Sequence, residues 1–158
     1  MIDFRASTEK DAHYLLDIDL KCFDYAWLPE DWRAISKACY GCVATWNETP
    51  ISMAIFGQTP YGNVEILKLA VKSSYRNRGI GSRLVFNCLL YAREIHALRL
   101  LMVVPEGQLC PGEPGDISSW LKHRGFRAQV PLLRNYFTFY GQPEDGVVFS
   151  LPVSQVRP

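Results

Sequence analysis

Residues 69–85, LAVKSSYRNRGIGSRLV, join an apolar strand pattern to a basic turn with two glycines and then to a helical pattern. The first backbone amides of a helix lack intrahelical partners and lie at the positive end of its dipole. Glycines let an anion approach these amides, and arginines add charge-assisted hydrogen bonds. The stretch therefore predicts a strand-to-helix junction that binds a pyrophosphate. A helix start with solvated basic residues is the alternative.

Two common nucleotide-binding motifs do not fit this turn. The nucleoside-triphosphate loop G-x-x-x-x-G-K-[ST] is absent, and the third glycine of a dinucleotide fingerprint is replaced by Leu84. The predicted pyrophosphate therefore belongs to a different class of ligand.

The segments around the turn predict a sheet crossed by helices. Residues 42–46, 51–58 and 64–71 read as strands joined by the short turns NETP and PYGN, which favours an antiparallel meander. Apolar residues then recur at helical spacing from Leu84 to Ile95, and residues 98–104 form an apolar run typical of a buried strand.

The two ends of the chain add helices and a hairpin. Thr8 and Asp11 resemble a capping box, Pro29 opens a second helix, and Asp116 and Gly125 delimit a helix over residues 117–124. Segments 126–140 and 146–152 predict a closing hairpin around GQPED. We therefore expect a single α/β domain over residues 1–158, with a mixed, mostly antiparallel sheet flanked by helices.

Composition excludes several classes of protein. The 17 basic and 16 acidic residues give a net charge of +1, which argues against a nucleic-acid partner. The chain has no long apolar run and no signal-peptide core, so we expect a cytoplasmic protein without a membrane partner. Cys39 and Cys42 form a lone C-x-x-C among five cysteines, and we expect reduced thiols and no metal.

The motif R-x-x-G-x-G at residues 76–81 resembles the acetyl-CoA signature [QR]-x-x-G-x-[GA] of the GNAT superfamily of N-acetyltransferases. The order of elements is similar over nearly the whole chain, including a last helix that ends in LKHRGF at residues 121–126. CFDYAWLPEDW and the C-terminal hairpin resemble the bacterial group that acetylates the N-terminal alanine of a ribosomal protein. The resemblance implies a GNAT fold and transfer of an acetyl group from acetyl-CoA to an amine.

The resemblance also implies how acetyl-CoA binds. The pantetheine arm would pair like an added strand with Leu69, Ala70 and Val71. Its pyrophosphate would be held by the backbone amides of Arg76, Asn77, Arg78, Gly79, Ile80, Gly81 and Ser82. The amide at Leu69 or its neighbour would stabilise an oxyanion.

Attack on a thioester needs a neutral amine, whereas an α-amine has a pKa of about 7.7–8.0 and a lysine about 10.4. Glu65 is our candidate base, because counted back from the glycine turn it matches the catalytic glutamate of the superfamily's histone-acetylating branch. The alternative is a surface glutamate paired with Lys68 or Lys72.

The expected general acid departs from the family's pattern. Leu121 stands where many relatives place a tyrosine, and Val103 stands where the ribosomal-protein group has a glutamate. Tyr136 and Tyr140 are possible substitutes, with Tyr136 our catalytic candidate. Aromatic packing between strands is the alternative for both.

An acceptor site is predicted from the aromatic loop before the second helix together with the closing hairpin. With nearby acids Glu30 and Asp31 it would receive a cationic amine; its predicted residues are Phe23, Asp24, Tyr25, Trp27 and Tyr140. Core packing would also explain the aromatic rings of the loop.

Two functions remain open from the sequence. The first is an acetyl-CoA-dependent N-acetyltransferase that acts through a tetrahedral intermediate on a protein N-terminus, a lysine or a small amine. The second is a catalytically impaired CoA-binding module that serves as a sensor or interaction partner, which the absence of a tyrosine at Leu121 favours. A third, acylation of aminoacyl-tRNA, is disfavoured by the near-neutral charge.

Overall fold

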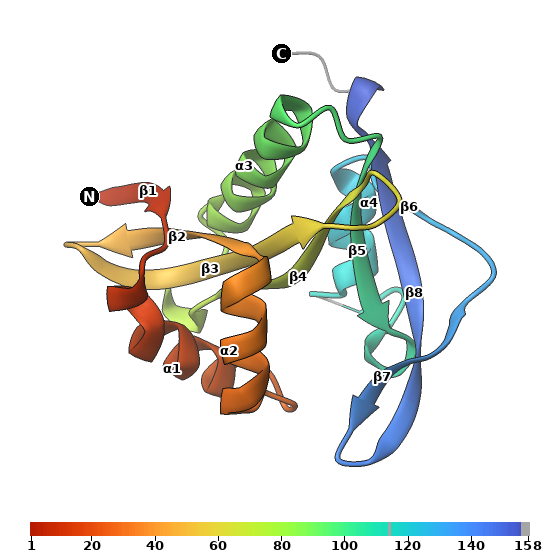
Figure 1. Ribbon diagram of the computed structural model, residues 1–158, viewed down its shortest axis with the longest axis horizontal. Helices are drawn as coiled ribbons and strands as arrows, with labels where there is room; N and C mark the ends of the chain where they lie inside the picture. The colour runs from red at the N-terminus through yellow and green to blue at the C-terminus, as the bar shows by residue number, and fades with distance from the viewer. Residues whose placement is uncertain (114, 156–158) are drawn as a thin grey trace.

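The computed structural model describes residues 1–113 and 115–155 as a curved sheet with helices on both faces (Figure 1). The helices are α1 (Ala12–Cys22), α2 (Pro29–Ala38), α3 (Ile80–Glu94) and α4 (Ile117–His123). The strands are β1 (Ile2–Ala6), β2 (Tyr40–Trp46), β3 (Thr49–Gln58), β4 (Val64–Val71), β5 (Arg99–Pro105), β6 (Arg127–Ala128), β7 (Leu133–Phe139) and β8 (Gln142–Pro152).

The strand order is β1-β2-β3-β4-β5-β8-β6, and β7 pairs with β8 beyond this path. β4 and β5 run parallel, and the other pairs in the described part of the chain are antiparallel. The mixed, mostly antiparallel sheet is therefore confirmed. The parallel pair is joined by α3, as a parallel connection requires a crossover.

Apolar side chains form a separate cluster on each face of the sheet. On one face α3 buries Leu84, Val85 and Cys88, which recur at helical spacing, in a cluster that also includes Leu121 of α4. On the other face, Ile18 of α1 lies in a second cluster with residues of β2, β3 and β4. Figure 1 shows α1 and α2 together on this second side. Helix α3 and the α1–α2 layer thus lie on opposite faces of the sheet.

The centre of the sheet splits after a short shared segment. Registered pairs between β4 and β5 run from Val64 with Leu100 to Ile66 with Met102. Beyond these pairs the two strands diverge, as Figure 1 shows. The β5-facing edge of β4 is therefore open along residues 67–71, the segment predicted to pair with the pantetheine arm.

A β-bulge lies at the start of this open segment. β3 pairs Ile55 with Lys68 but Phe56 with Ile66, so that Leu67 is the additional residue. A bulge of this kind interrupts the alternation of side chains along a strand. As a result, Leu67 and Lys68 both face the α1 side of the sheet, where Leu67 joins the second cluster.

Several predicted boundaries are confirmed. A capping box at Thr8 and Asp11 precedes α1, and Pro29 occupies the first turn of α2. The Asp116 carboxylate accepts the Ser119 N–H at the start of α4, and Gly125 follows the helix with a φ of +91°. The short strand β1, which pairs with β2, was not predicted.

The closing hairpin differs from the prediction in two places. Its turn lies at Tyr140 and Gly141, with φ values of +50° and +79°, so residues 142–145 of GQPED belong to β8. Two residues of positive φ form the turn that matches the twist of hairpin strands. Residues 126–140 are also not one strand, because residues 129–132 separate β6 from β7 and include Pro131, which has no N–H to donate.

Within the residues described, no helix combines the length and apolar character needed to cross a membrane. The same residues contain no cluster of histidine, cysteine, aspartate and glutamate side chains suited to a metal ion. Cys39 and Cys42 are free thiols, at the end of α2 and in β2.

Candidate active site

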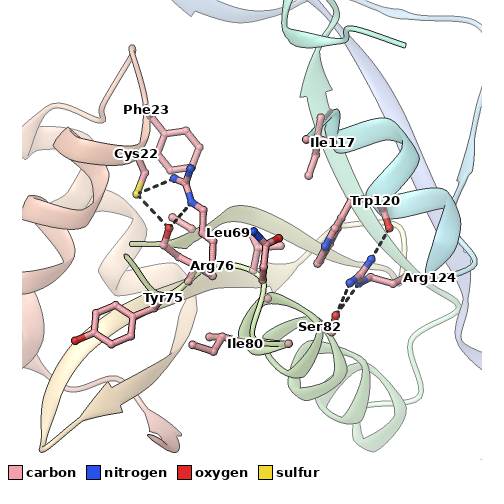
Figure 2. Close-up of a pocket in the computed structure, with 16 residues that line it drawn as sticks. Cys22, Phe23, Leu69, Tyr75, Arg76, Ile80, Ser82, Ile117, Trp120 and Arg124 are labelled. Atoms are coloured by element: carbon pink, nitrogen blue, oxygen red, sulfur yellow. Dashed lines mark hydrogen bonds between the residues drawn. The ribbon is translucent and has the colours of Figure 1, made fainter. Parts of the chain in front are cut away.

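A cavity of about 560 Å³ opens where β4 leaves β5. Figure 2 shows its walls, which come from the end of α1, the open segment of β4, the turn before α3, and α4. Nine of the residues predicted to bind acetyl-CoA line it: Leu69, Ala70, Val71, Arg76, Asn77, Gly79, Ile80, Gly81 and Ser82. The structure thus brings the strand and the glycine turn to one cavity.

The start of α3 presents unused backbone donors to this cavity. Gly79 has a φ of +79°, a left-handed conformation that favours glycine, and the first helical hydrogen bond runs from Arg83 N to Gly79 O over 3.1 Å. The amides of residues 80–82 precede that bond and so lack intrahelical partners. Gly81 is favoured for a different reason, since a Cβ there would lie 3.1 Å from the Trp120 ring, a tight contact.

The arginines of the motif hold the turn itself. Arg76 Nε donates to Val71 O over 2.9 Å, and its Nη2 lies 3.8 Å from Cys22 Sγ. Arg78 does not line the cavity; its Nη2 donates to Ser74 O, and its guanidinium lies over the Tyr75 ring. In this structure their side chains therefore fasten the loop to β4, α1 and the preceding turn.

Glu65 and Tyr136, the two predicted catalytic residues, are in direct contact. The Tyr136 O–H lies 2.8 Å from Glu65 Oε1 and 3.0 Å from Oε2, and donates to the carboxylate. Burial raises the pKa of Glu65, and the Tyr136 hydrogen bond lowers it in part. The pKa of Tyr136 is raised by burial and by the Glu65 charge, so the phenol stays protonated.

The alternative for Glu65, a pairing with Lys68 or Lys72, is not found in the structure. Lys72 Nζ lies 3.9 Å from Asp17, and the buried Lys68 ammonium pairs with the Asp19 carboxylate. The bulge explains this partner, because it turns Lys68 toward α1. Burial lowers the pKa of Lys68, and the hydrogen bond to Asp19 opposes that shift.

Phe23 and Trp27, predicted to bind the acceptor, surround this internal cation. Lys68 Nζ lies 4.6 Å from the centre of the Phe23 ring and 4.4 Å from that of Trp27. These are cation–π distances. The rings thus contact the protein's own ammonium, and this contact attaches the loop after α1 to β4.

Asp19 links the same loop to α2. Its Oδ2 accepts the Trp27 N–H over 2.9 Å and the Trp32 indole N–H over 3.2 Å. None of the residues of α2 is fully buried. One carboxylate therefore joins α1, the α1–α2 loop, α2 and β4.

The remaining acceptor residues lie at the contact between the loop and the closing hairpin. The Tyr25 ring stacks on Phe139 at 4.4 Å and meets the edge of Tyr140 at 5.2 Å. Asp24 is exposed on the same loop. The aromatic contact bridges two segments that lie more than a hundred residues apart in the chain.

The sequence profile of the acetyltransferase (GNAT) family matches residues 12–108, which include α1, the bulged strand β4 and the glycine turn. The chain belongs to the GNAT family of acetyltransferases. A comparison with the sequences of curated proteins gives no significant match.

Solved structures show the same GNAT fold. Ribosomal-protein-S18-alanine N-acetyltransferase from Escherichia coli superposes with a TM-score of 0.78 and 16% identity, covering 99% of this chain and 97% of that one. Arabidopsis thaliana NAA60 in complex with acetyl-CoA gives 0.80 and 19%, covering 98% and 99%. A GNAT acetyltransferase from Elizabethkingia anophelis with acetyl-CoA bound gives 0.71 and 18%, covering 96% and 97%.

The two positions at which the resemblance led us to look for an acid carry no titratable group. Leu121 is fully buried in the core, and Val103 is half-buried in β5 opposite Val148. The α4 residues that line the cavity are Ile117 and Trp120, and the Trp120 indole N–H can donate a hydrogen bond but is not an acid at neutral pH.

Two features of the site were missed from the sequence. Arg124 lines the cavity and donates to Ser82, 42 residues earlier in the chain, although no local pattern marks it. Asp19 was not singled out either, because an aspartate within an amphipathic helix ordinarily faces solvent. Only the packing of α1 on the bulged strand shows that it is buried.

Proposed function

We propose that this GNAT chain transfers an acetyl group from acetyl-CoA to a primary amine by direct attack, through a tetrahedral intermediate. The observation that carries the proposal is the cavity between the open edge of β4 and the first amides of α3. The two sets of backbone groups suit two parts of acetyl-CoA. A strand edge can pair with the amide groups of the pantetheine arm, and a helix start can bind the pyrophosphate.

On the donor side, residues 69–71 would align the pantetheine arm and so fix the thioester next to the bulge. A backbone amide preorganised at Leu69 would stabilise the developing oxyanion, because such a donor needs no reorganisation during the reaction. The residues of α3 would hold the pyrophosphate and set the depth of the arm in the cavity.

On the acceptor side, Glu65 would remove a proton from the incoming ammonium, directly or through one water. Its raised pKa makes the carboxylate a stronger base than an exposed glutamate. Tyr136 contacts the catalytic carboxylate and would orient it, a role that suits a phenol that stays protonated. The CoA thiolate can leave without a dedicated acid, because thiols are far more acidic than alcohols, with a pKa of about 8.5 for cysteine.

The contact between Tyr25 and Phe139 favours an acceptor that enters end-on. A polypeptide that crossed this side of the site would have to separate the stacked rings. An α-amine also loses its proton more easily than a lysine, with a pKa of about 7.7–8.0 against about 10.4. A protein N-terminus therefore ranks above an internal lysine, and the name of the E. coli structure, an alanine N-acetyltransferase, agrees with this.

A second candidate function is a CoA-binding module without turnover. The buried side chain of Leu121 favours it, because α4 then offers no acid to the leaving thiol. Binding of acetyl-CoA is common to both candidates, and only thiol release separates them.

The test is calorimetric titration with acetyl-CoA, followed by thiol release with three acceptor sets. These are peptides with free N-termini, peptides with a blocked N-terminus and an internal lysine, and small amines. We expect binding, and release that is fastest with free N-termini. Gly79→Glu should weaken binding at least about 100-fold, since the side chain adds strain at positive φ and places negative charge beside the phosphate amides. Wild-type affinity in this variant would exclude the donor site.

Tyr136→Phe tests how the phenol acts on Glu65. A base must be ionised, so activity is present above the pKa of Glu65 and is lost as the pH falls through it. Removing the hydrogen bond that lowers this pKa should move the acidic limb of kcat/KM to higher pH. The loss should therefore be larger at pH 6 than at pH 8.

The control is Tyr61→Phe, which removes the same hydroxyl from an exposed turn. An equal loss at all pH values in Tyr136→Phe would mean that the phenol does not tune Glu65.

A further inference from the structure

We propose that Arg124, which caps the C-terminal end of α4, binds a phosphate group of the acyl donor together with Ser82 of α3. The inference rests on the proposed function and adds to it a binding residue that lies outside the glycine-turn motif. It also assigns α4 a role in selecting a phosphorylated donor over a shorter pantetheine thioester.

Three kinds of contact hold the Arg124 side chain next to the first turn of α3. Its Nε donates to Ser82 Oγ over 2.9 Å, a second bond to the same oxygen comes from Nη2, and Nη1 donates to Trp120 O over 2.8 Å. The guanidinium carbon also lies 3.6 Å from the centre of the Trp120 ring. Figure 2 shows this arrangement beside the cavity.

These contacts leave donors for a ligand. They engage three of the five N–H groups of a guanidinium, so two remain. The Ser82 oxygen accepts from Arg124, and within the described residues its own O–H has no protein acceptor. Because the side chains are already ordered, binding a phosphate would cost little further rotamer entropy.

The charge of Arg124 points to an anionic ligand. The side chain is half-buried, and no carboxylate in the described part of the chain pairs with it. Burial lowers its pKa, as expected for a cation without a counterion. Arg76, by contrast, is directed to Val71 O, whereas Arg124 bonds to Ser82 in the first turn of α3.

The phosphate could be either part of the pyrophosphate or the 3′-phosphate, and three ligands distinguish them. Acetyl-CoA carries both, acetyl-dephospho-CoA lacks the 3′-phosphate, and S-acetylpantetheine lacks all phosphate. We expect Arg124→Gln to weaken acetyl-CoA binding about 10- to 100-fold, the range for a lost charge-assisted hydrogen bond. S-Acetylpantetheine should bind wild type and variant equally.

Loss with both nucleotide-bearing ligands would assign the pyrophosphate, and loss with acetyl-CoA alone would assign the 3′-phosphate. Lys122→Gln, an equal change of charge at an exposed site on the same helix, is the control and should bind like wild type. Ser82→Ala, which removes the anchor of the guanidinium, should give a smaller loss. Thermal melting without ligand reports whether each variant is folded.

Equal affinity of wild type and Arg124→Gln for acetyl-CoA would overturn the inference and leave the proposed function intact. An equal loss with S-acetylpantetheine would also overturn it, because Arg124 would then act only by packing α4. Failure of wild type to bind acetyl-CoA would instead overturn the proposed function, and this inference with it.

Discussion

Replacement of Glu65 by glutamine should lower kcat about 10²- to 10⁴-fold, the usual contribution of a general base. The amide has nearly the same size and can still accept a hydrogen bond from the Tyr136 phenol, so the local structure should be retained. Affinity for acetyl-CoA should not change, because Glu65 is not among the residues that line the donor cavity.

The measurement is thiol release over pH 5–10 with a peptide acceptor, together with the dissociation constant of acetyl-CoA. In wild type the rate should fall as the pH drops through the raised pKa of Glu65, and the variant should lack this limb. In the variant the rate should rise only as the amine loses its proton in solution. Glu94→Gln, at the exposed end of α3, is the matched control. A wild-type rate at neutral pH in Glu65→Gln would remove Glu65 from the mechanism.

Asp19→Ala should destabilise the fold by about 3–5 kcal/mol, the range for breaking a buried ion pair by removing one partner. The substitution leaves the Lys68 ammonium buried without its counterion. It also removes the acceptor for the Trp27 and Trp32 N–H groups. Equilibrium unfolding in urea would measure the loss.

Asp17→Ala is the control, because Asp17 lies on the same helix and forms an exposed pair with Lys21 over 2.9 Å. Exposed pairs of this kind contribute about 0.3–0.5 kcal/mol. The double variant Asp19→Leu with Lys68→Met should recover much of the stability, since apolar residues often replace a buried ion pair without loss. A cost for Asp19→Ala no greater than that for Asp17→Ala would show that the pair does not hold the fold.

The donor side of the molecule was predictable because its signals are local. Strand β4 begins and ends at the predicted residues, and α3 follows the glycine turn as its apolar spacing indicates. Most of the cavity then forms from neighbours in sequence, and the end of α1 and the α4 segment complete it. The location of Glu65 on β4 followed from counting along the strand, whereas its contact with Tyr136 required the hairpin to return 71 residues later.

The acceptor side was less predictable because it depends on contacts between distant segments. The bulge at Leu67 has no clear sequence signal, yet it decides which face Lys68 occupies. Phe23 and Trp27 were therefore assigned to an external cation, although they contact this internal one. The predicted turn of the closing hairpin, GQPED, lies one residue or more beyond the observed one. Tyr140 adopts a positive φ there, which its residue type does not suggest.

The short parallel pairing of β4 and β5 has a mechanical consequence. Three residue pairs between β4 and β5 join the two halves of the sheet. Beyond these pairs, in the described part of the chain, β4 pairs only with β3, and β5 pairs only with β8. A donor that hydrogen-bonds along the open edge of β4 would lengthen this seam from the inside. The bound co-substrate would then form part of the sheet. Each cycle of binding and release would make the connection between the two halves of the sheet more rigid and then more flexible.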